Sequence, residues 1–247
     1  MVRWRSIWSM LLAVQAVQST AQGPVPFVSD LERTMLFVEG RFLEVDARPA
    51  RTMHVLNDGL LFTDHAERLC LFSYEAHNVQ VLEPRPLDQL QVSGDRAAWI
   101  MGDSLFTLRG GRAHLLARGV QRFQLSDSLI VLQDSAEHEL AVIWRGRRSP
   151  LATVEHGSET PQWAQGVNTV SFYDRSRRTL SIFERGELRT LATDTDPGAV
   201  VPGNGIVGFW DGARDEFVGD AGRGPVKLSG MRPINAQAGD GIVAFVD

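Results

Sequence analysis

The stretch Ile206-Val207-Gly208-Phe209-Trp210-Asp211 returns in a relaxed form as Ile242-Val243-Ala244-Phe245-Val246-Asp247, where the chain stops. Each stretch is a short apolar run that ends on an aspartate, which is typical of a buried β-strand leading into a turn. Comparable runs recur with a period of about 37 residues. Short strands repeated at this spacing predict an all-β protein built from similar sheets, or blades.

Each repeat is predicted to hold four strands. In the repeat that begins near Ala199 they span 199–204, 206–211, 215–219 and 225–228. The second strands of successive repeats are predicted at 60–64, 97–101, 129–134, 169–174, 206–211 and 242–247. They align one bulky side chain each in a column that reads Phe62, Trp99, Leu132, Phe172, Phe209 and Phe245. A column of this kind predicts a continuous core layer. Charge and Pro150 in the fourth strands predict exposed outer edges.

The two ends of the repeat region are incomplete. The N-terminal part offers a third and a fourth strand, at 34–39 and 41–45, and the C-terminal part offers a first and a second, at 234–239 and 241–247. We therefore expect a six-bladed β-propeller with five contiguous blades and one composite blade. The last strand would pair with the N-terminal strands and close the ring, which removes free sheet edges.

A family resemblance supports this fold. Within a repeat, an apolar strand such as 206–211 is followed by a strand such as Leu180-Ser181-Ile182-Phe183 and then by one such as Leu188-Arg189-Thr190-Leu191. This order resembles the repeats of the six-bladed TolB-like and WD40-like periplasmic propellers. The Ser-Pro-Asp-Gly turn of those repeats is absent. The matching turns read Asn57-Asp58-Gly59, Gly94-Asp95, Gly203-Asn204-Gly205 and Gly239-Asp240-Gly241. The resemblance thus implies the fold, and it does not imply that the protein has that family's partners.

Residues 1–21 are predicted to be a secretory signal peptide, because Arg3 and Arg5 precede an apolar run that ends in small residues. Residues 22–247 would form one propeller domain, periplasmic or secreted and not inserted in a membrane. The formal net charge of −5 disfavours binding to nucleic acid. Cys70, the single cysteine, lies among apolar residues, which indicates a buried and inert thiol.

An aspartate ends most second strands and would lie on one face of the blades. The column comprises Asp64, Asp134, Asp174, Asp211 and Asp247. It could form a carboxylate rim that binds cations. The alternative is that each aspartate starts a hairpin turn, which is a structural role that its side chain favours.

The same face is predicted to carry the two longest loops between blades, at 154–161 and 193–198, and long loops are where repeat proteins often bind. Their acidic residues and histidine could hold a hard cation or act as an acid and base pair, or could be ordinary turn residues. Aromatic side chains nearby could stack on a sugar or peptide, or fill gaps between blades. The candidate ligand-binding residues are Glu155, His156, Glu159, Trp163, Tyr173, Asp194, Asp196 and Trp210.

No catalytic motif is present. The sequence lacks a Gly-x-Ser-x-Gly elbow, a phosphate-binding Gly-x-x-x-x-Gly-Lys loop and a Cys-x-x-Cys pair, and Glu137-His138-Glu139 lacks a second histidine at metal spacing. Arg145-Gly146-Arg147-Arg148, on the opposite face, is interpreted as a solvated hairpin tip. No catalytic residue, metal or cofactor is therefore predicted.

Three functions follow as hypotheses. The first is a binding scaffold for an envelope protein, a peptide or a glycan. The second is a carbohydrate-active hydrolase or lyase that uses the carboxylates and His156 on the long-loop face. The third is a structural domain without a dedicated ligand. The first is favoured because a signal peptide and a closed ring are predicted without a catalytic motif.

Overall fold

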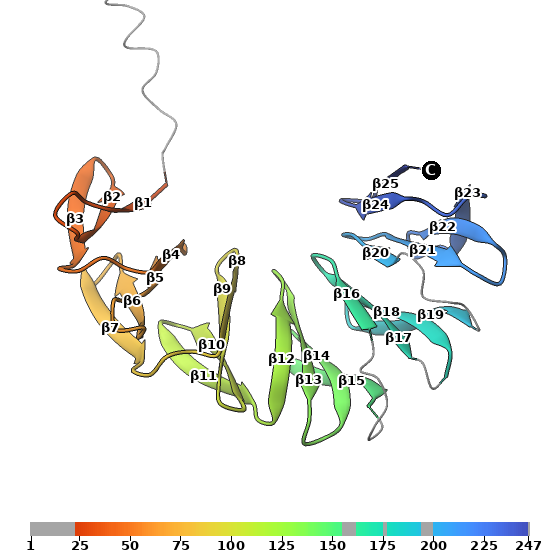
Figure 1. The fold of residues 1–247 in the computed structure, drawn as a ribbon, viewed down its shortest axis with the longest axis horizontal. Coiled ribbons are helices and arrows are strands. Elements are labelled where there is room, and N and C mark those ends of the chain that lie inside the picture. The colour runs from red at the N-terminus through yellow and green to blue at the C-terminus, as the bar shows by residue number, and fades with distance from the viewer. Residues whose placement is uncertain (1–22, 155–161, 175–176, 194–199, 247) are drawn as a thin grey trace, which may run out of the picture. The chain divides into compact units, whose positions relative to one another are not determined.

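The computed structural model describes residues 23–154, 162–174, 177–193 and 200–246 (Figure 1). These residues form antiparallel strands joined by short connections, which confirms the all-β prediction. In the described ranges no helix has the length and apolarity needed to span a membrane. The predicted signal peptide lies outside them. The chain divides into two compact units, Met1–Arg85 and Pro86–Asp247.

The first unit holds two sheets, with strand orders β1-β2-β3 and β4-β5-β6-β7. The strands are β1 (Val25–Val28), β2 (Thr34–Val38), β3 (Arg41–Asp46), β4 (Thr52–Val55), β5 (Gly59–Thr63), β6 (Leu69–Ser73) and β7 (Asn78–Glu83). Leu36 of β2 and Phe62 of β5 belong to one core cluster, which also contains Cys70. Burial raises the pKa of the Cys70 thiol to about 11, so the thiol is protonated at neutral pH, as expected of an inert cysteine.

The second unit holds four four-stranded sheets and a final two-stranded sheet. The strands of the first two are β8 (Gln89–Ser93), β9 (Arg96–Met101), β10 (Ser104–Arg109), β11 (Arg112–Ala117), β12 (Val120–Leu125), β13 (Leu129–Asp134), β14 (Glu139–Trp144) and β15 (Arg147–Thr153). Those of the next two are β16 (Gln162–Gln165), β17 (Thr169–Asp174), β18 (Thr179–Glu184), β19 (Glu187–Thr193), β20 (Val200–Pro202), β21 (Val207–Asp211), β22 (Glu216–Asp220) and β23 (Pro225–Ser229). The last pair is β24 (Asn235–Ala238) and β25 (Val243–Val246).

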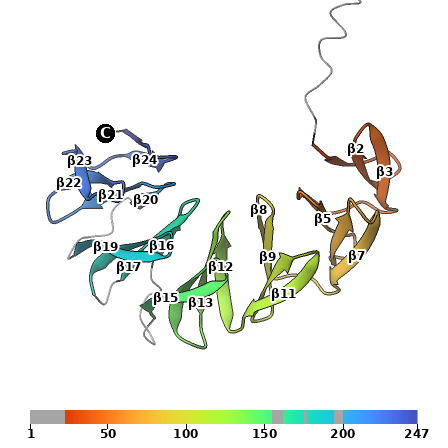
Figure 2. The same ribbon diagram turned by 180° about the vertical axis from the view of Figure 1, so that it is seen from behind.

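Within the second unit the sheets repeat one arrangement. Figures 1 and 2 show the first strands β8, β12, β16, β20 and β24 along the inner side of the row of sheets and the fourth strands β11, β15, β19 and β23 along its outer side. Pro150 lies in the outer strand β15, where its missing N–H is tolerated. The pairing of each third strand with its fourth strand contains a register shift, the mark of a bulge that increases local twist.

The five predicted contiguous blades match the five four-stranded sheets, but the composite blade is wrong. β2 was expected to pair with the C-terminal strand. Its neighbours are instead β3 and β1, whose Val25–Val28 pairs with 34–37. Pro26 lies within the short run Val-Pro-Phe-Val, and a proline argues against a strand when only the sequence is known. Proline is tolerated here because β1 is an edge strand. β24 and β25 form a sheet of their own, which gives seven sheets among the described residues.

The predicted column of bulky residues is confirmed as a core layer. Phe62, Trp99, Leu132 and Phe209 have no exposed surface and Phe172 is 3% exposed. Phe245 is half-buried and packs edge-on against Phe217 at 5.3 Å between ring centroids. The period of about 37 residues therefore reflects one bulky residue that each repeat contributes to this layer.

The turns that join first to second strands form what we call the inner rim. Its turns in the second unit are 93–96, 126–129, 166–169, 203–206 and 239–242. Side chains connect one turn to the next: Ser126 Oγ donates to the Val167 carbonyl at 2.8 Å, and Asn168 Nδ2 donates to Asn204 Oδ1 at 3.1 Å. A Cβ on Gly203 would lie 2.5 Å from the Gly239 carbonyl oxygen, so this close backbone approach requires glycine.

Candidate functional site

The aspartates that end the second strands have a structural role. Asp64 is 1% exposed; its Oδ1 accepts the backbone N–H groups of Ala66 and Arg68, each at 2.9 Å. Asp134 and Asp211 accept backbone N–H groups of the following turns in the same manner. The turn interpretation is confirmed for these residues. In the described ranges no group of three or more potential ligand side chains is placed to hold a metal ion, and Asp247 lies outside them.

The other predicted ligand-binding residues are only partly described. Glu155, His156, Glu159, Asp194 and Asp196 lie outside the described residues, so their role stays a prediction. Tyr173 is 8% exposed and belongs to a core cluster with Val207 and Phe209, where it fills space between neighbouring sheets. Trp210 is also buried, at 8% exposure.

Trp163 is half-buried and engaged within the fold. Its Nε1 donates to Gln124 Oε1 at 3.0 Å, and the Arg122 guanidinium lies 4.1 Å from the centre of its ring. The second unit contains a groove lined by several charged side chains, and none of the three aromatic residues Trp163, Tyr173 and Trp210 lines it.

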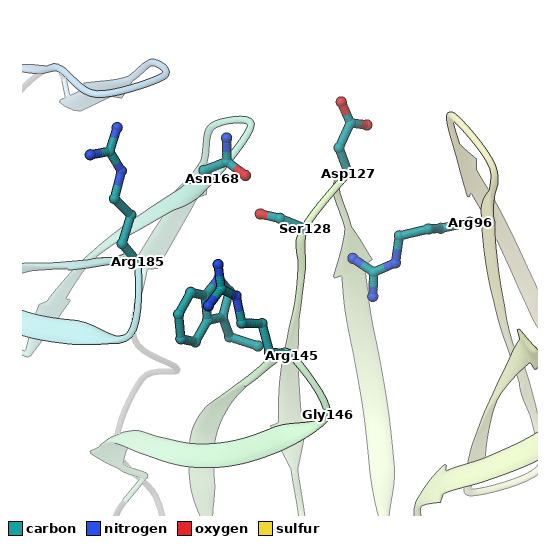
Figure 3. A pocket seen from close by; sticks show the side chains of 8 residues that line it. Arg96, Asp127, Ser128, Arg145, Gly146, Asn168 and Arg185 are labelled. Carbon is teal, nitrogen blue, oxygen red and sulfur yellow. The ribbon is translucent and has the colours of Figure 1, made fainter.

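That groove has a volume of about 680 Å³ (Figure 3). It includes the Arg145-Gly146 turn, which the sequence predicts to be part of a solvated hairpin tip on the face opposite the long loops. It is formed by inner-rim turns and by the turns that join third to fourth strands. The residues that line it are Arg96, Asp127, Ser128, Trp144, Arg145, Gly146, Asn168 and Arg185. All belong to the second unit, and they come from three adjacent sheets.

Two hairpin turns supply Arg145 and Arg185. Arg145-Gly146 joins β14 to β15, and Arg185-Gly186 joins β18 to β19. Both arginines have positive φ, 50° and 52°, as the first position of a two-residue type I′ turn demands. Each of these two turns thus places an arginine in the lining of the groove.

Trp144 holds these two turns together. The Arg145 guanidinium lies over its ring, 4.5 Å from the ring centre, a favourable cation–π arrangement. Gly186 of the neighbouring hairpin approaches the ring so closely that a Cβ there would lie 2.6 Å from Trp144 Cζ3. The tryptophan therefore restricts Arg145 and fits against the turn that carries Arg185.

Arg96 is fixed from the other side of the groove. It is half-buried, and its Nη1 donates to the Ser126 carbonyl at 3.1 Å. Burial lowers the pKa of its guanidinium, and the Asp127 carboxylate opposes that shift. Since an arginine remains protonated at neutral pH in either case, Arg96 brings a fixed positive charge.

Neutral and acidic groups complete the lining. Asp127 is exposed and accepts a hydrogen bond from Ser93. Asn168 uses its amide nitrogen to bond Asn204, and Figure 3 shows its amide oxygen turned toward Ser128. The groove consequently offers three guanidinium groups, one hydroxyl, one carboxylate and one amide oxygen. This set can bind a ligand that has both anionic groups and N–H donors.

Sequence reasoning missed this site because it judged each hairpin separately. Arg145-Gly146-Arg147-Arg148 was interpreted as a solvated tip, and Arg147 and Arg148 do lie outside the groove lining. A signal was present in the repetition of Arg-Gly at the same turn of two consecutive repeats, Arg145-Gly146 and Arg185-Gly186. Alignment of the repeats predicts that these arginines share a face.

A second hollow of about 410 Å³ adjoins the inner rim and shares Asp127 with the groove. Its lining is largely backbone and small side chains, including Gly166, Gly203 and Gly239. It extends the same face without adding a cationic side chain.

Solved structures resemble the chain at low similarity. Human WBSCR16 is 9% identical over 88% of this chain and 82% of its own, with a TM-score of 0.44. Prp20p from Saccharomyces cerevisiae is 7% identical over 89% and 80%, with a TM-score of 0.45. Hsv2 from Kluyveromyces lactis is 11% identical over 88% and 83%, also with a TM-score of 0.45. No curated protein sequence matches the chain.

One family model matches almost the whole sequence. It is that of the 10-bladed beta propeller domain, and the match spans residues 18–247. The match agrees with the β-propeller expectation, while its blade number differs from the six predicted here. The chain, with its repeated antiparallel sheets and their inner rim, belongs to the ten-bladed β-propeller domain family.

Proposed function

We propose that the protein is a binding scaffold that holds a protein partner on the groove face of its second unit. The observation that carries the proposal is the groove itself, in which side chains from three sheets line a space of about 680 Å³. Ligand pockets have volumes of roughly 300 to 1,000 Å³. Turns on a rigid repeat scaffold are common places for binding.

We also propose that the protein works in the periplasm or outside the cell, with an envelope protein as its partner. Support comes from the order of charged, apolar and small residues in 1–21. Recovery from the envelope fraction of a mature chain that begins at Gln22 is the expected result.

Site-specific photocrosslinking tests the scaffold proposal. A photoreactive amino acid replaces Ser128 in the groove or, as a control, the exposed Ala113 of outer strand β11. In cells of the source organism we expect a covalent adduct with one protein from the Ser128 position and none from Ala113. Equal labelling at both positions, or an adduct only at Ala113, contradicts the proposal.

The long-loop site is a competing proposal that the same experiment tests. A third photoreactive position, at His156, tests the predicted long-loop site. The other residues predicted for that site are Glu155, Glu159, Trp163, Tyr173, Asp194, Asp196 and Trp210. An adduct there and none at Ser128 transfers the binding face to those loops. A glycan ligand, or the hydrolase and lyase alternative, rests on those same loop residues and stays a prediction.

A further inference from the structure

We infer that the groove recognises an acidic segment of polypeptide, with side-chain carboxylates bound by Arg96, Arg145 and Arg185. The inference rests on the proposed function and specifies the chemistry of its partner. Its first support is charge. The chain has a formal net charge of −5, yet the groove gathers three arginines against one aspartate.

The arginines of the two hairpins are free to bind an anion. In the part of the chain that the structure describes, no carboxylate forms an ion pair with Arg145 or Arg185. Some arginines outside the groove are paired, by contrast: Arg148 lies 2.8 Å from Asp134, and Arg189 lies 3.2 Å from Asp220. A guanidinium binds a carboxylate through two parallel hydrogen bonds, which adds geometric selectivity to the charge attraction.

Two of the cationic groups are already positioned. Trp144 supports the Arg145 guanidinium at 4.5 Å, and the Ser126 carbonyl holds Arg96. Restricting side chains before binding lowers the entropy lost when the ligand arrives. The carboxylates would therefore meet a largely prepared surface.

The acceptors in the groove distinguish a peptide from a polyanion. Asn168 directs its amide oxygen into the groove, because its nitrogen bonds Asn204, and Asp127 adds a carboxylate. Both groups accept hydrogen bonds from the backbone N–H groups of a peptide. A phosphate backbone or an acidic polysaccharide has few or no N–H donors to offer these two acceptors. The groove is also far larger than a single ion, since one water molecule occupies about 30 Å³.

Fluorescence anisotropy with the full mature protein tests the inference. The probe is a labelled oligoglutamate peptide, and the uncharged comparison is oligoglutamine. The test variant R145Q/R185Q removes two groove charges. The control R112Q/R223Q removes two exposed arginines outside the groove lining, from the β10–β11 and β22–β23 hairpins, and changes the net charge equally.

The wild type and the R112Q/R223Q control should bind oligoglutamate with similar affinity, and R145Q/R185Q should bind it about ten-fold more weakly or worse. Binding should weaken as salt increases, because the contacts are ionic. Thermal melts verify that both variants fold. Equal loss in both variants, equal binding of oligoglutamine, or preference for polygalacturonate over oligoglutamate overturns the inference.

The outcome separates this inference from the proposed function. If oligoglutamate fails to bind while crosslinking at Ser128 still captures a protein, the acidic segment is wrong and the scaffold stands. If oligoglutamate binds in the groove while no protein crosslinks there, the ligand chemistry is right and the partner protein is wrong.

Discussion

At the scale of single residues, the groove depends on side chains that the local backbone does not favour. Arg145 and Arg185 have φ near +50°, a region in which asparagine, aspartate and glycine are preferred. The turn geometry thus gives no reason for arginine at either position. The reason we find is placement, since both guanidinium groups line one groove and one of them lies over Trp144.

Gly186→Ala should be clearly more destabilising than Gly146→Ala. Both glycines have positive φ, but a Cβ at 186 would lie 2.6 Å from the Trp144 ring, whereas nothing lies within 4 Å at 146. We expect Gly186→Ala to lower the free energy of unfolding by about 1–3 kcal/mol more than Gly146→Ala. Urea denaturation measures the difference. Equal effects would show that the contact with Trp144 contributes nothing.

Asp64 should make stability sensitive to acid. Burial alone raises the pKa of this carboxyl, but hydrogen bonds from the Arg68 side chain and from the backbone amides of Arg68 and Ala66 outweigh it, and the pKa is lowered. A carboxyl with a lowered pKa stabilises the fold above its unfolded pKa of about 4 and loses that contribution as pH falls through the folded value.

Asp64→Asn should therefore lower the free energy of unfolding by about 1–3 kcal/mol at pH 7 and lose less stability than the wild type between pH 4 and pH 2. Denaturation at each pH gives both values. Asp58→Asn, at an exposed side chain, serves as the control and should follow the wild type. Parallel pH profiles for the wild type and Asp64→Asn would show that the carboxylate adds no acid sensitivity.

At the scale of elements, β1 is the strand that changes the interpretation of the N-terminal sheet. It pairs with β2 from Val25 to Val28, and Phe27 contacts Phe42 of β3 with ring centroids 5.9 Å apart. It thus takes the place beside β2 that the composite blade had reserved for the C-terminus.

Removing 23–28 from the mature chain should expose one edge of β2. The amides of Thr34–Val38 should then exchange hydrogen faster, since part of their pairing is lost. Exchange in β13, within another unit, should stay unchanged and serves as the internal control. The composite-blade scheme makes the opposite prediction, in which removal of 241–247 exposes β2 and removal of 23–28 leaves it protected.

At the scale of the whole molecule, sequence periodicity predicted the sheets because each repeat places one large side chain in the core. Trp99, Leu132 and Phe209 are buried at the expected places. The strand at Val25–Val28 was not predicted, because it was not matched to a strand of the other repeats. Pro26 also interrupts its apolar pattern, which makes the segment look less like a strand. The number of blades could likewise not be predicted from the periodicity, since it depends on how the strands of incomplete repeats pair.

The groove was less accessible to sequence reasoning than the core. Arg96, Arg145 and Arg185 come from different sheets, and only packing brings them to one space. The hydrophobic pattern carries no information about which turns meet. Two of the arginines are distinguished by tertiary contacts, Arg145 with Trp144 and Arg96 with the Ser126 carbonyl of the inner rim. Comparison of equivalent turns between repeats is the step that would have suggested them.

The two-residue hairpins that carry Arg145 and Arg185 have a practical consequence for protein engineering. In each hairpin the arginine is the first residue of a two-residue turn and does not belong to the buried core, so it can be replaced while the glycine of the turn is kept. Replacing the first residue of each turn by glutamate, for example, would reverse the local charge while keeping the glycine that the turn requires. Under the proposed function, such a replacement would change the ligand preference of the groove one hairpin at a time.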